Sequence, residues 1–324
     1  MVKANGYGHG AVPLARAALE AGAWGLAVST LDEAAQVAQL VEGERILVMG
    51  GLAPAEVTEA AAAGFAIGCS NLDLARGLSE AAADPIPVHL KVDTGMGRFG
   101  CAPEKAPELA RFIAGARRLR LAGTWTHFHS AESDEAATRR QFEVFQHTLD
   151  SLGVDPGLRH ACNSAAALRF PEMALDAVRA GIALYGCEAP EMKPVLAVRA
   201  LVTHVKALPA GATVGYGATW RAERPAQVAS VSIGYADGVF RSRSNRGWVL
   251  VRGRRAPLVG TVSMDTVTVD VSAIEGVSFG DAATFIGADG AQRITAEQVA
   301  EWSGTISYEV LTAVGRRVER RYLE

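Results

Sequence analysis

The sequence predicts a (β/α)8 (TIM) barrel followed by a mainly antiparallel β domain. In the first half of the chain, short apolar runs alternate with alanine-rich segments of helical period, which is typical of parallel strands joined by helical crossovers. After about residue 185, runs rich in β-branched residues are separated by Gly, Pro and Asn, which indicates antiparallel strands. With 324 residues the chain is long enough for two domains.

Eight apolar runs in the first half have the length of strands, and eight strands with crossovers favour a closed barrel over an open sheet. They are residues 2–4, 24–28, 45–49, 65–69, 88–92, 121–128, 158–162 and 176–179. The alternative, an open doubly wound sheet, usually has a nucleotide-type glycine fingerprint after its first strand. The run Gly6-Tyr7-Gly8-His9-Gly10 does not have that spacing, so we favour the barrel.

The crossovers between these strands are predicted to be helices because their apolar residues recur at helical spacing. They are residues 11–21, 31–39, 53–63, 72–82, 103–114 and 135–152, with a short helix at 165–168.

The second domain is predicted from a series of short strands with few helices. The strands are residues 196–205, 213–216, 227–233, 248–251, 256–262 and 267–271, and one helix follows at 295–302. An acidic, proline-containing stretch at 188–194 is the best candidate for a linker. We therefore expect a barrel over 1–190 and a β domain over 195–324.

The composition excludes several classes of function. The net charge is −3 and charges of both signs are intermixed, so neither nucleic acid nor a membrane surface is an expected partner. The cysteines are scattered without the spacing of a zinc site or a disulfide framework, so we expect no metal and a reducing, cytoplasmic environment. We also expect no membrane span and no signal peptide. The cysteines are Cys69, Cys101, Cys162 and Cys187.

Candidate ligand-binding groups follow the first, seventh and eighth predicted strands. Lys3 precedes a glycine-rich turn, which suits an amine that meets a ligand beyond a strand end, although a terminal lysine is usually only solvated. Barrels bind ligands at the carboxyl ends of their strands, and phosphate often binds after strands seven and eight. There Ser164 offers a hydroxyl and helix N-terminal amides, and Gly181 and Ile182 offer backbone that an anion can approach. A simple helix cap and a simple turn are the alternatives.

Nine segments in order carry a more specific pattern. They are VKANGYGHG, KVDTGMGRFG, THFHSAESDE, NSAAALRFP, VRAGIALYG, VGYGATW, IGYADG, NRGWVLVRGRRAPLVGTVSMD and SYEVL, between residues 2 and 311. In sequence and spacing they resemble the signature blocks of bacterial alanine racemases. The resemblance implies pyridoxal 5′-phosphate as cofactor, interconversion of L- and D-alanine, and supply of D-alanine to peptidoglycan.

Two bases are implied by this resemblance. Racemisation requires the removal of a weakly acidic Cα proton and the return of a proton to the opposite face. Lys3 matches the lysine that holds the cofactor covalently and faces the Cα of the D-isomer. Tyr216 matches the second base, with Arg98 and His127 as its support, because a phenol ordinarily stays protonated near neutral pH. In the family this tyrosine enters the partner subunit's site, which implies a homodimer with shared active sites.

Three cations are matched to supporting roles. Arg179 resembles the arginine that faces the pyridine nitrogen, and it would make the cofactor a weaker electron sink because guanidinium does not readily give up a proton. Such a sink discourages transamination. Arg98 matches the residue that orients the cofactor's phenolic oxygen and the substrate carboxylate. Lys91 matches a lysine that is carbamylated in family members, and the carbamate would pair with Arg98. An unmodified lysine is the alternative.

Further contacts with the cofactor and the substrate follow from the same blocks. The phosphate ligands would be Tyr7, Ser164, Gly181, Ile182 and Tyr308. The wall and entry of the substrate pocket would be formed by Tyr235, Met264 and Asp265. Bulky side chains such as Met264 and Tyr235 favour a methyl-sized substrate group.

Other functions remain possible on the same scaffold. A serine racemase or broad-specificity racemase is one alternative, and a pyridoxal phosphate-binding protein without turnover is another. A related amino-acid decarboxylase fits less well, because Arg179 and its surroundings follow the racemase pattern. Family members usually carry a further strand of the β domain before the cofactor lysine. We expect that strand to be missing here, because Lys3 follows only Met1 and Val2.

Overall fold

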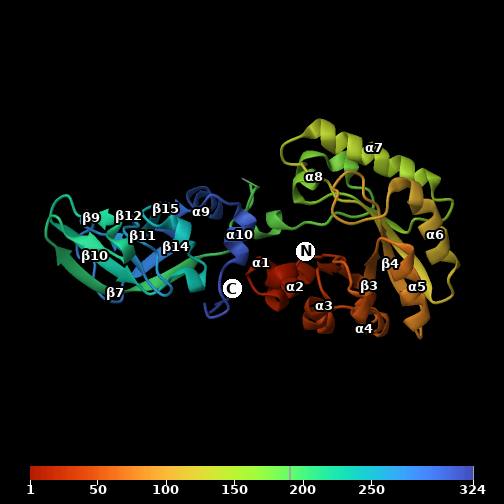
Figure 1. Cartoon of the computed structure of the whole chain (residues 1–324), viewed down its shortest axis with the longest axis horizontal. Coiled ribbons are helices and arrows are strands. Elements are labelled where there is room, and N and C mark those ends of the chain that lie inside the picture. The colour runs from red at the N-terminus through yellow and green to blue at the C-terminus, as the bar shows by residue number, and fades with distance from the viewer. Residues whose placement is uncertain (190, 324) are drawn as a thin grey trace. The chain divides into compact units, whose positions relative to one another are not determined.

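The computed structural model describes residues 1–189 and 191–323 and divides into two compact units (Figure 1). Unit 1 contains Met1–Gly6 and Gly10–Ala183, and unit 2 contains Tyr7–His9 and Leu184–Glu324. The tripeptide Tyr7–His9 therefore belongs to unit 2, although the residues on both sides of it belong to unit 1. Pro190, which falls in the predicted linker 188–194, lies outside the described residues.

Unit 1 is built on a parallel sheet whose six strands lie in their order along the chain. The strands are β1 (Leu26–Val28), β2 (Ile46–Val48), β3 (Ala66–Cys69), β4 (Ile86–Lys91), β5 (Leu119–Trp125) and β6 (Leu158–His160). Every residue of β2, β3 and β4 is buried, as expected of parallel strands covered on both faces. All six correspond to predicted strands, although most are shorter than predicted.

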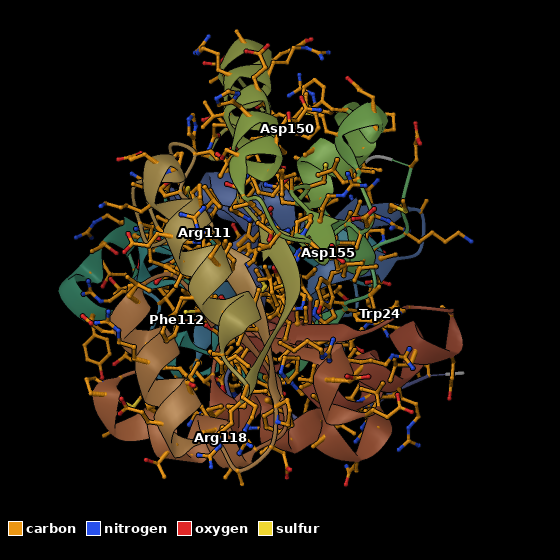
Figure 2. All side chains as sticks on the ribbon, turned by 90° about the vertical axis from the view of Figure 1, so that its right-hand side faces the viewer. Trp24, Arg111, Phe112, Arg118, Asp150 and Asp155 are labelled. Atoms are coloured by element: carbon orange, nitrogen blue, oxygen red, sulfur yellow. The ribbon has the colours of Figure 1, made fainter. Side chains whose placement is uncertain are left out.

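Helices cover the outside of this sheet, and Figure 2 shows Arg111 and Phe112 on α6 and Asp150 on α7 in that outer layer. The helices are α2 (Ala11–Glu20), α3 (Leu31–Val37), α4 (Val57–Ala62), α5 (Leu72–Ala81), α6 (Ala106–Gly115), α7 (Glu135–Ser151) and α8 (Ser164–Arg169), whereas α1 (Lys3–Tyr7) is a short turn with left-handed backbone. Side-chain oxygens of Thr30, Asn71, Asp134 and Asn163 accept backbone N–H groups at the starts of α3, α5, α7 and α8. These N-caps satisfy amides that the first helical turn leaves unpaired.

The predicted strand at 2–4 is wrong. Lys3 begins the turn α1, in which Ala4 and Asn5 have φ of 51° and 53°, in the left-handed region. Because the chain turns so soon, only Val2 pairs with the sheet, through its N–H to the carbonyl of Ala27 at 3.0 Å.

The predicted strand at 176–179 is wrong as well. Its backbone makes isolated hydrogen bonds instead of a ladder: the N–H of Asp176 donates to Arg159 and that of Arg179 donates to Cys162. Leu175, with φ of 55°, bends the chain just before this segment. Two irregular segments therefore take the places of the first and last strands of the predicted barrel.

Unit 2 contains a seven-stranded, mainly antiparallel assembly with the order β12-β11-β14-β7-β10-β13, in which β15 pairs with β14. The strands are β7 (Val198–Leu208), β10 (Ala226–Val231), β11 (Trp248–Val251), β12 (Arg254–Pro257), β13 (Val267–Asp270), β14 (Ala282–Asp289) and β15 (Gln292–Ile294). A separate hairpin joins β8 (Thr213–Val214) to β9 (Trp220–Arg221), and the helices are α9 (Ala296–Ser303) and α10 (Ser307–Thr312). The predicted fold class, an α/β barrel followed by a mainly antiparallel β domain, is confirmed.

Two predicted boundaries in unit 2 are corrected. The strand at 213–216 ends at Val214, and Tyr216 lies in a 3₁₀ turn because Gly215 and Gly217 have φ of 73° and 71°. The strand at 256–262 is displaced toward the N-terminus, since β12 ends at Pro257. The strands β9, β14 and β15 and the helix α10 were not predicted.

Among the described residues, no helix is both long and apolar enough to cross a bilayer. The same residues contain no group of three or more His, Cys, Asp or Glu side chains able to hold a metal ion. All four cysteines are buried and none forms a disulfide.

Candidate active site

Lys3 stands where the chain leaves the sheet of unit 1. The backbone beside it is held by Glu33 on α3, whose carboxylate accepts the N–H of Ala4 at 2.6 Å and that of Ser29 at 2.7 Å. Burial lowers the pKa of Lys3, the charge of Arg98 lowers it further, and the charge of Glu33 partly opposes both. A lowered pKa favours the neutral amine, which is the form that attacks a carbonyl group.

Arg179 is a buried cation held by neutral acceptors. Its Nη atoms donate to the carbonyls of His160, Ala161 and Thr126 at 2.7–2.9 Å and to Nδ1 of His160 at 2.9 Å. No carboxylate hydrogen-bonds to it among the described residues, and burial lowers its pKa to about 10. Its Nε is a buried donor with no acceptor within the described part of the chain. The site therefore offers one unused guanidinium N–H.

The hydrogen bonds of Arg179 determine the proton positions on two buried histidines. Because guanidinium only donates, Nδ1 of His160 accepts, and its proton lies on Nε2. That Nε2 lies 2.9 Å from Nδ1 of His89, which in turn accepts. Burial lowers the pKa of His160 well below its usual value and that of His89 to about 4, so both rings are neutral near pH 7.

His127 follows β5 and lies against the same guanidinium, with Nδ1 3.3 Å from Nη2 of Arg179. By the same argument its Nδ1 accepts and its proton lies on Nε2. Burial lowers its pKa to about 3, with further contributions from Arg179, Arg98, Lys91 and Lys3. The imidazole is therefore neutral and surrounded by cations.

Lys91 ends β4 with its amine among aromatic rings. Nζ lies 3.5 Å from the ring centroid of Phe99 and 4.7 Å from that of Trp125, which are cation–π distances. Neither Nζ nor Nε1 of Trp125 has a hydrogen-bond partner among the described residues, although both are buried. Burial lowers the pKa of Lys91 to about 8, and the charge of Arg98 contributes.

Arg98 lies in the loop after β4, and its guanidinium stacks on Phe99 with 5.6 Å between Cζ and the ring centroid. Asp93 shapes this loop, because its carboxylate accepts the N–H groups of Gly95 and Gly97 at 3.0–3.1 Å. The charge of Arg98 contributes to the lowered pKa of Lys3, Lys91 and His127. These four residues and Arg179 thus form one electrostatically linked cluster in unit 1.

Ser164 begins α8, and its Oγ accepts the N–H of Gly181 at 2.7 Å and that of Ala183 at 3.3 Å. A hydroxyl that accepts two N–H groups keeps its own hydrogen to donate. Ser164 is 5% exposed, and Ile182, which lies between the two donors, is buried. This arrangement brings the predicted phosphate ligands Ser164, Gly181 and Ile182 together.

The other two predicted phosphate ligands, Tyr7 and Tyr308, meet in unit 2. Their ring centroids are 6.1 Å apart, and the ring of Tyr7 stacks on Tyr185 at 4.7 Å. Burial raises the pKa of Tyr7 to about 12, so its hydroxyl stays protonated. Arg320 binds the carbonyl of Gly8 through Nε and Nη2, at 3.1 and 3.0 Å, and so fixes the turn that carries Tyr7.

The predicted pocket wall lies in unit 2 around Arg317. This side chain donates to Asp265 at 2.5 Å and to Asp237 at 2.6 Å. The backbone N–H of Tyr235 donates to Ser263, and that of Ala236 to the carbonyl of Met264. Hydrogen bonds therefore keep the segments that carry Asp265, Met264 and Tyr235 next to each other. The side chains of Tyr235 and Met264 are exposed.

Tyr216 presents its side chain to solvent and is 74% exposed. The turn that carries it is fixed by Thr261, whose hydroxyl donates to the carbonyl of Tyr216 at 2.8 Å. The backbone of Tyr216 is therefore fixed, and its side chain is exposed.

Two family models cover almost the whole chain. The model described as alanine racemase, N-terminal domain, matches residues 1–189, and that described as alanine racemase, C-terminal domain, matches residues 195–322. The chain belongs to the alanine racemase family. It is therefore a pyridoxal phosphate-dependent amino-acid racemase, as the signature blocks predicted.

Curated relatives and solved structures agree with this assignment. The chain is 42% identical to an alanine racemase of Desulforamulus reducens, with 100% of this chain and 91% of the relative aligned. It is 40% identical to one of Sorangium cellulosum over the same shares. Among solved structures, alanine racemase from Bacillus anthracis with bound L-Ala-P has a TM-score of 0.90 at 36% identity, covering 98% of this chain and 86% of that one. The enzyme from Streptomyces lavendulae has a TM-score of 0.92 at 37% identity, covering 100% and 89%.

The residues of unit 1 fit the cofactor of this family. The unused Nε–H of Arg179 suits a pyridine nitrogen that accepts a hydrogen bond, and the free hydroxyl hydrogen of Ser164 suits a phosphate oxygen. The lowered pKa of Lys3 suits an amine that condenses with an aldehyde. Two hydrogen-bond donors and one nucleophilic amine thus match the ring nitrogen, the phosphate and the aldehyde of pyridoxal phosphate.

Several residues of this site were not singled out in the sequence. Glu33, His160 and Arg320 each fix a predicted site residue or the turn beside it through hydrogen bonds. His160 is the last residue of β6, three residues before Asn163-Ser164, and its place at a strand end next to the predicted phosphate ligands is the one signal the sequence offers for it. Glu33 and Arg320 have none, because the contacts that matter here are with the backbone of Ala4 and of Gly8, which are distant in the sequence.

Proposed function

We propose that this enzyme interconverts L- and D-alanine with two bases, Lys3 on one face of Cα and Tyr216 on the other. When bound, pyridoxal phosphate supplies an electron sink for the charge left at Cα. The cluster around Lys3 supports its role as a base, because the lowered pKa gives the amine a neutral, proton-accepting form at lower pH. This cluster of perturbed groups in unit 1 is the observation that carries the proposal.

The cofactor would be held by Lys3, Tyr7, Ser164, Arg179, Tyr308 and the backbone of Gly181 and Ile182. Support comes from the hydroxyl hydrogen that Ser164 keeps and from the buried Nε–H of Arg179. Arg179 would donate to the ring nitrogen without giving up its proton. The enzyme would thereby favour return of the proton to Cα over transamination.

Tyr216 would act in the active site of a second copy of the chain, so the active form would be a homodimer with shared sites. Its 74% exposure supports this role, since its phenol is available to a partner. His127 and Arg98 would support its proton transfer. His127 is suited to accept or donate a hydrogen bond as a neutral ring, because its pKa is about 3.

Arg98 would bind the substrate carboxylate, and Tyr235, Met264 and Asp265 would form the pocket wall. The bulk of Tyr235 and Met264 favours a methyl side chain, which makes alanine the proposed substrate. Serine is only slightly larger and is the alternative.

Lys91 would carry a carbamate. The neutral amine adds to CO₂ to give N–COO⁻ and one released proton, so a pKa of about 8 makes more amine available than an ordinary lysine has. The product would give Arg98 an anionic neighbour and give Nε1 of Trp125 an acceptor. Mass spectrometry of the intact protein in bicarbonate, compared with CO₂-free buffer, tests this, and Lys91→Arg should show no adduct at this position.

We further propose a cytoplasmic enzyme that supplies D-alanine for peptidoglycan, with the barrel in 1–190 and the β domain in 195–324. The buried, unpaired thiols support a reducing compartment.

The direct test is racemisation of L-alanine and of L-serine by the purified chain loaded with pyridoxal phosphate. The proposal expects turnover of alanine well above that of serine, and a dimer by sedimentation under the assay conditions. Comparable turnover of both would favour the broad-specificity alternative. Cofactor binding without turnover of either would favour a non-catalytic binding protein.

A further inference from the structure

Gln141 is a buried amide in α7 that hydrogen-bonds to three groups at the strand ends of unit 1. It is 3% exposed. Its Oε1 accepts the backbone N–H of His129 at 3.0 Å, and its Nε2 donates to the carbonyl of His127 at 3.2 Å and to Oγ1 of Thr94 at 3.3 Å. The side chain thus joins the segment after β5 to the loop after β4.

The orientation of this amide is fixed by its partners. A backbone N–H can only donate and a carbonyl can only accept, so Oε1 must face His129 and the NH₂ group must face the carbonyl of His127. The flipped amide would place donor against donor and acceptor against acceptor. Gln141 therefore holds the peptide groups on both sides of Phe128 in one arrangement.

Two buried threonines extend the hydrogen bonds of Gln141, and each group in this chain donates to the next. Thr126 donates to the carbonyl of Val92 at 3.0 Å, which uses its only hydrogen. Thr94, 2.8 Å away, must then donate to Thr126, and it accepts from Gln141 in turn. Both threonines are buried, so their hydroxyl groups depend on these hydrogen bonds and not on bulk water. The chain of donors runs from Gln141 on α7 to Thr94 in the loop after β4, then to Thr126 just after β5, and ends at the carbonyl of Val92.

The two segments held in this way carry His127 and Arg98. The imidazole of His127 accepts from Arg179, and that contact depends on where the backbone of residue 127 lies. Thr94 lies four residues before Arg98 in the same loop after β4. A Cβ at Gly95, which has φ of 134°, would lie 3.5 Å from Cγ of Gln141, so the loop packs directly on this side chain.

We propose that Gln141 is a positioning residue for racemisation: through its amide it sets the places of His127 and of the loop that bears Arg98. The proposal rests on the roles given to His127 and Arg98 in the proposed function. Gln141 itself touches neither reacting atoms nor cofactor in this account.

Gln141→Met tests the proposal, because methionine keeps the length of the side chain and removes all three hydrogen bonds. Gln146→Met is the matched control, since Gln146 is exposed on the same helix. Below the melting temperature of either variant, kcat for L-alanine should fall about 10- to 100-fold in Gln141→Met and stay unchanged in Gln146→Met. The ring ¹⁵N shifts of His127 should move in Gln141→Met only. Thr94→Val, which interrupts the chain of donors at one link, should show a smaller effect of the same kind.

Wild-type kcat together with wild-type His127 shifts in Gln141→Met would overturn the proposal. A loss of activity matched by the unfolded fraction would also overturn it, because that is the result of a purely structural role. If Gln141→Met does not fold, Thr94→Val decides the question by the same two measurements. If the wild-type enzyme does not racemise alanine, the proposed function fails, and the His127 shifts alone decide whether Gln141 positions that ring.

Discussion

Nη1 of Arg179 donates to Nδ1 of His160 at 2.9 Å, and this one contact fixes the charge state of the deepest part of the site. Because arginine cannot accept a hydrogen bond, Nδ1 of His160 must carry no proton, so the ring is neutral. Its Nε2–H then donates a hydrogen bond to Nδ1 of His89. The guanidinium has no carboxylate partner among the described residues, and its burial lowers its pKa to about 10. The neutral rings of His160 and His89 thus hold the guanidinium of Arg179 in place, and its positive charge remains.

Arg179→Glu should change the outcome of the reaction as well as its rate. A buried carboxyl has a raised pKa and can protonate a ring nitrogen, which would strengthen the electron sink and favour transamination. We expect racemisation to fall about 100-fold and pyruvate release from alanine to rise above that of the wild type. A coupled assay for pyruvate measures this, with Arg179→Lys as the variant that keeps a cation. Equal pyruvate release in the two variants would contradict the proposed role.

The lowered pKa of Lys91 should make the free energy of unfolding rise with pH in the alkaline range. Its pKa is about 8 in the folded state against 10.5 for an ordinary lysine, so the unfolded chain binds more protons between these values. The free energy of unfolding should therefore rise with pH from about 8 to about 10.5, by up to about 3 kcal/mol. Urea unfolding in CO₂-free buffer at pH 8 and pH 10 tests this. The rise should be smaller in Lys91→Met, and an equal rise in both proteins would show that Lys91 is not its source.

Ser164→Ala should weaken cofactor binding. It removes the acceptor for the N–H groups of Gly181 and Ala183 and the hydroxyl hydrogen available to a phosphate. We expect the dissociation constant of pyridoxal phosphate to rise about tenfold, the loss of roughly one net hydrogen bond. Absorbance titration of the apo-enzyme measures it, and Ser151→Ala, outside the site, should behave as wild type. An unchanged constant would remove Ser164 from the phosphate site.

The sequence predicted the layered architecture because periodicity reports which face of each segment is buried. It predicted Ser164 and Gly181 as neighbours because both were expected to follow strands at the same edge of a barrel. The hydrogen bond between them agrees, although the segment before Gly181 is irregular and not a strand. It did not predict the turn at Lys3, because left-handed backbone at Ala4 and Asn5 has no signature in a pattern of apolar residues.

The supporting residues were harder to find. Gln141 lies in a polar helix and resembles Gln146, yet one is buried and the other is exposed. The difference depends on which face of α7 meets the sheet and on backbone acceptors at residues 127 and 129, and neither is visible locally. The proposed roles of Lys3, Tyr216 and the other site residues follow from motif matches, and these roles stay predictions until variants are measured.

The central claim, two bases on opposite faces, is tested most directly by Cα exchange in D₂O with Tyr216→Phe. This variant keeps the ring and removes the phenol. With Lys3 intact, deuterium should still enter the Cα of D-alanine, whereas exchange into L-alanine and racemisation should fall at least about 100-fold. Equal loss of exchange from both isomers, or racemisation at the wild-type rate, would contradict the two-base account.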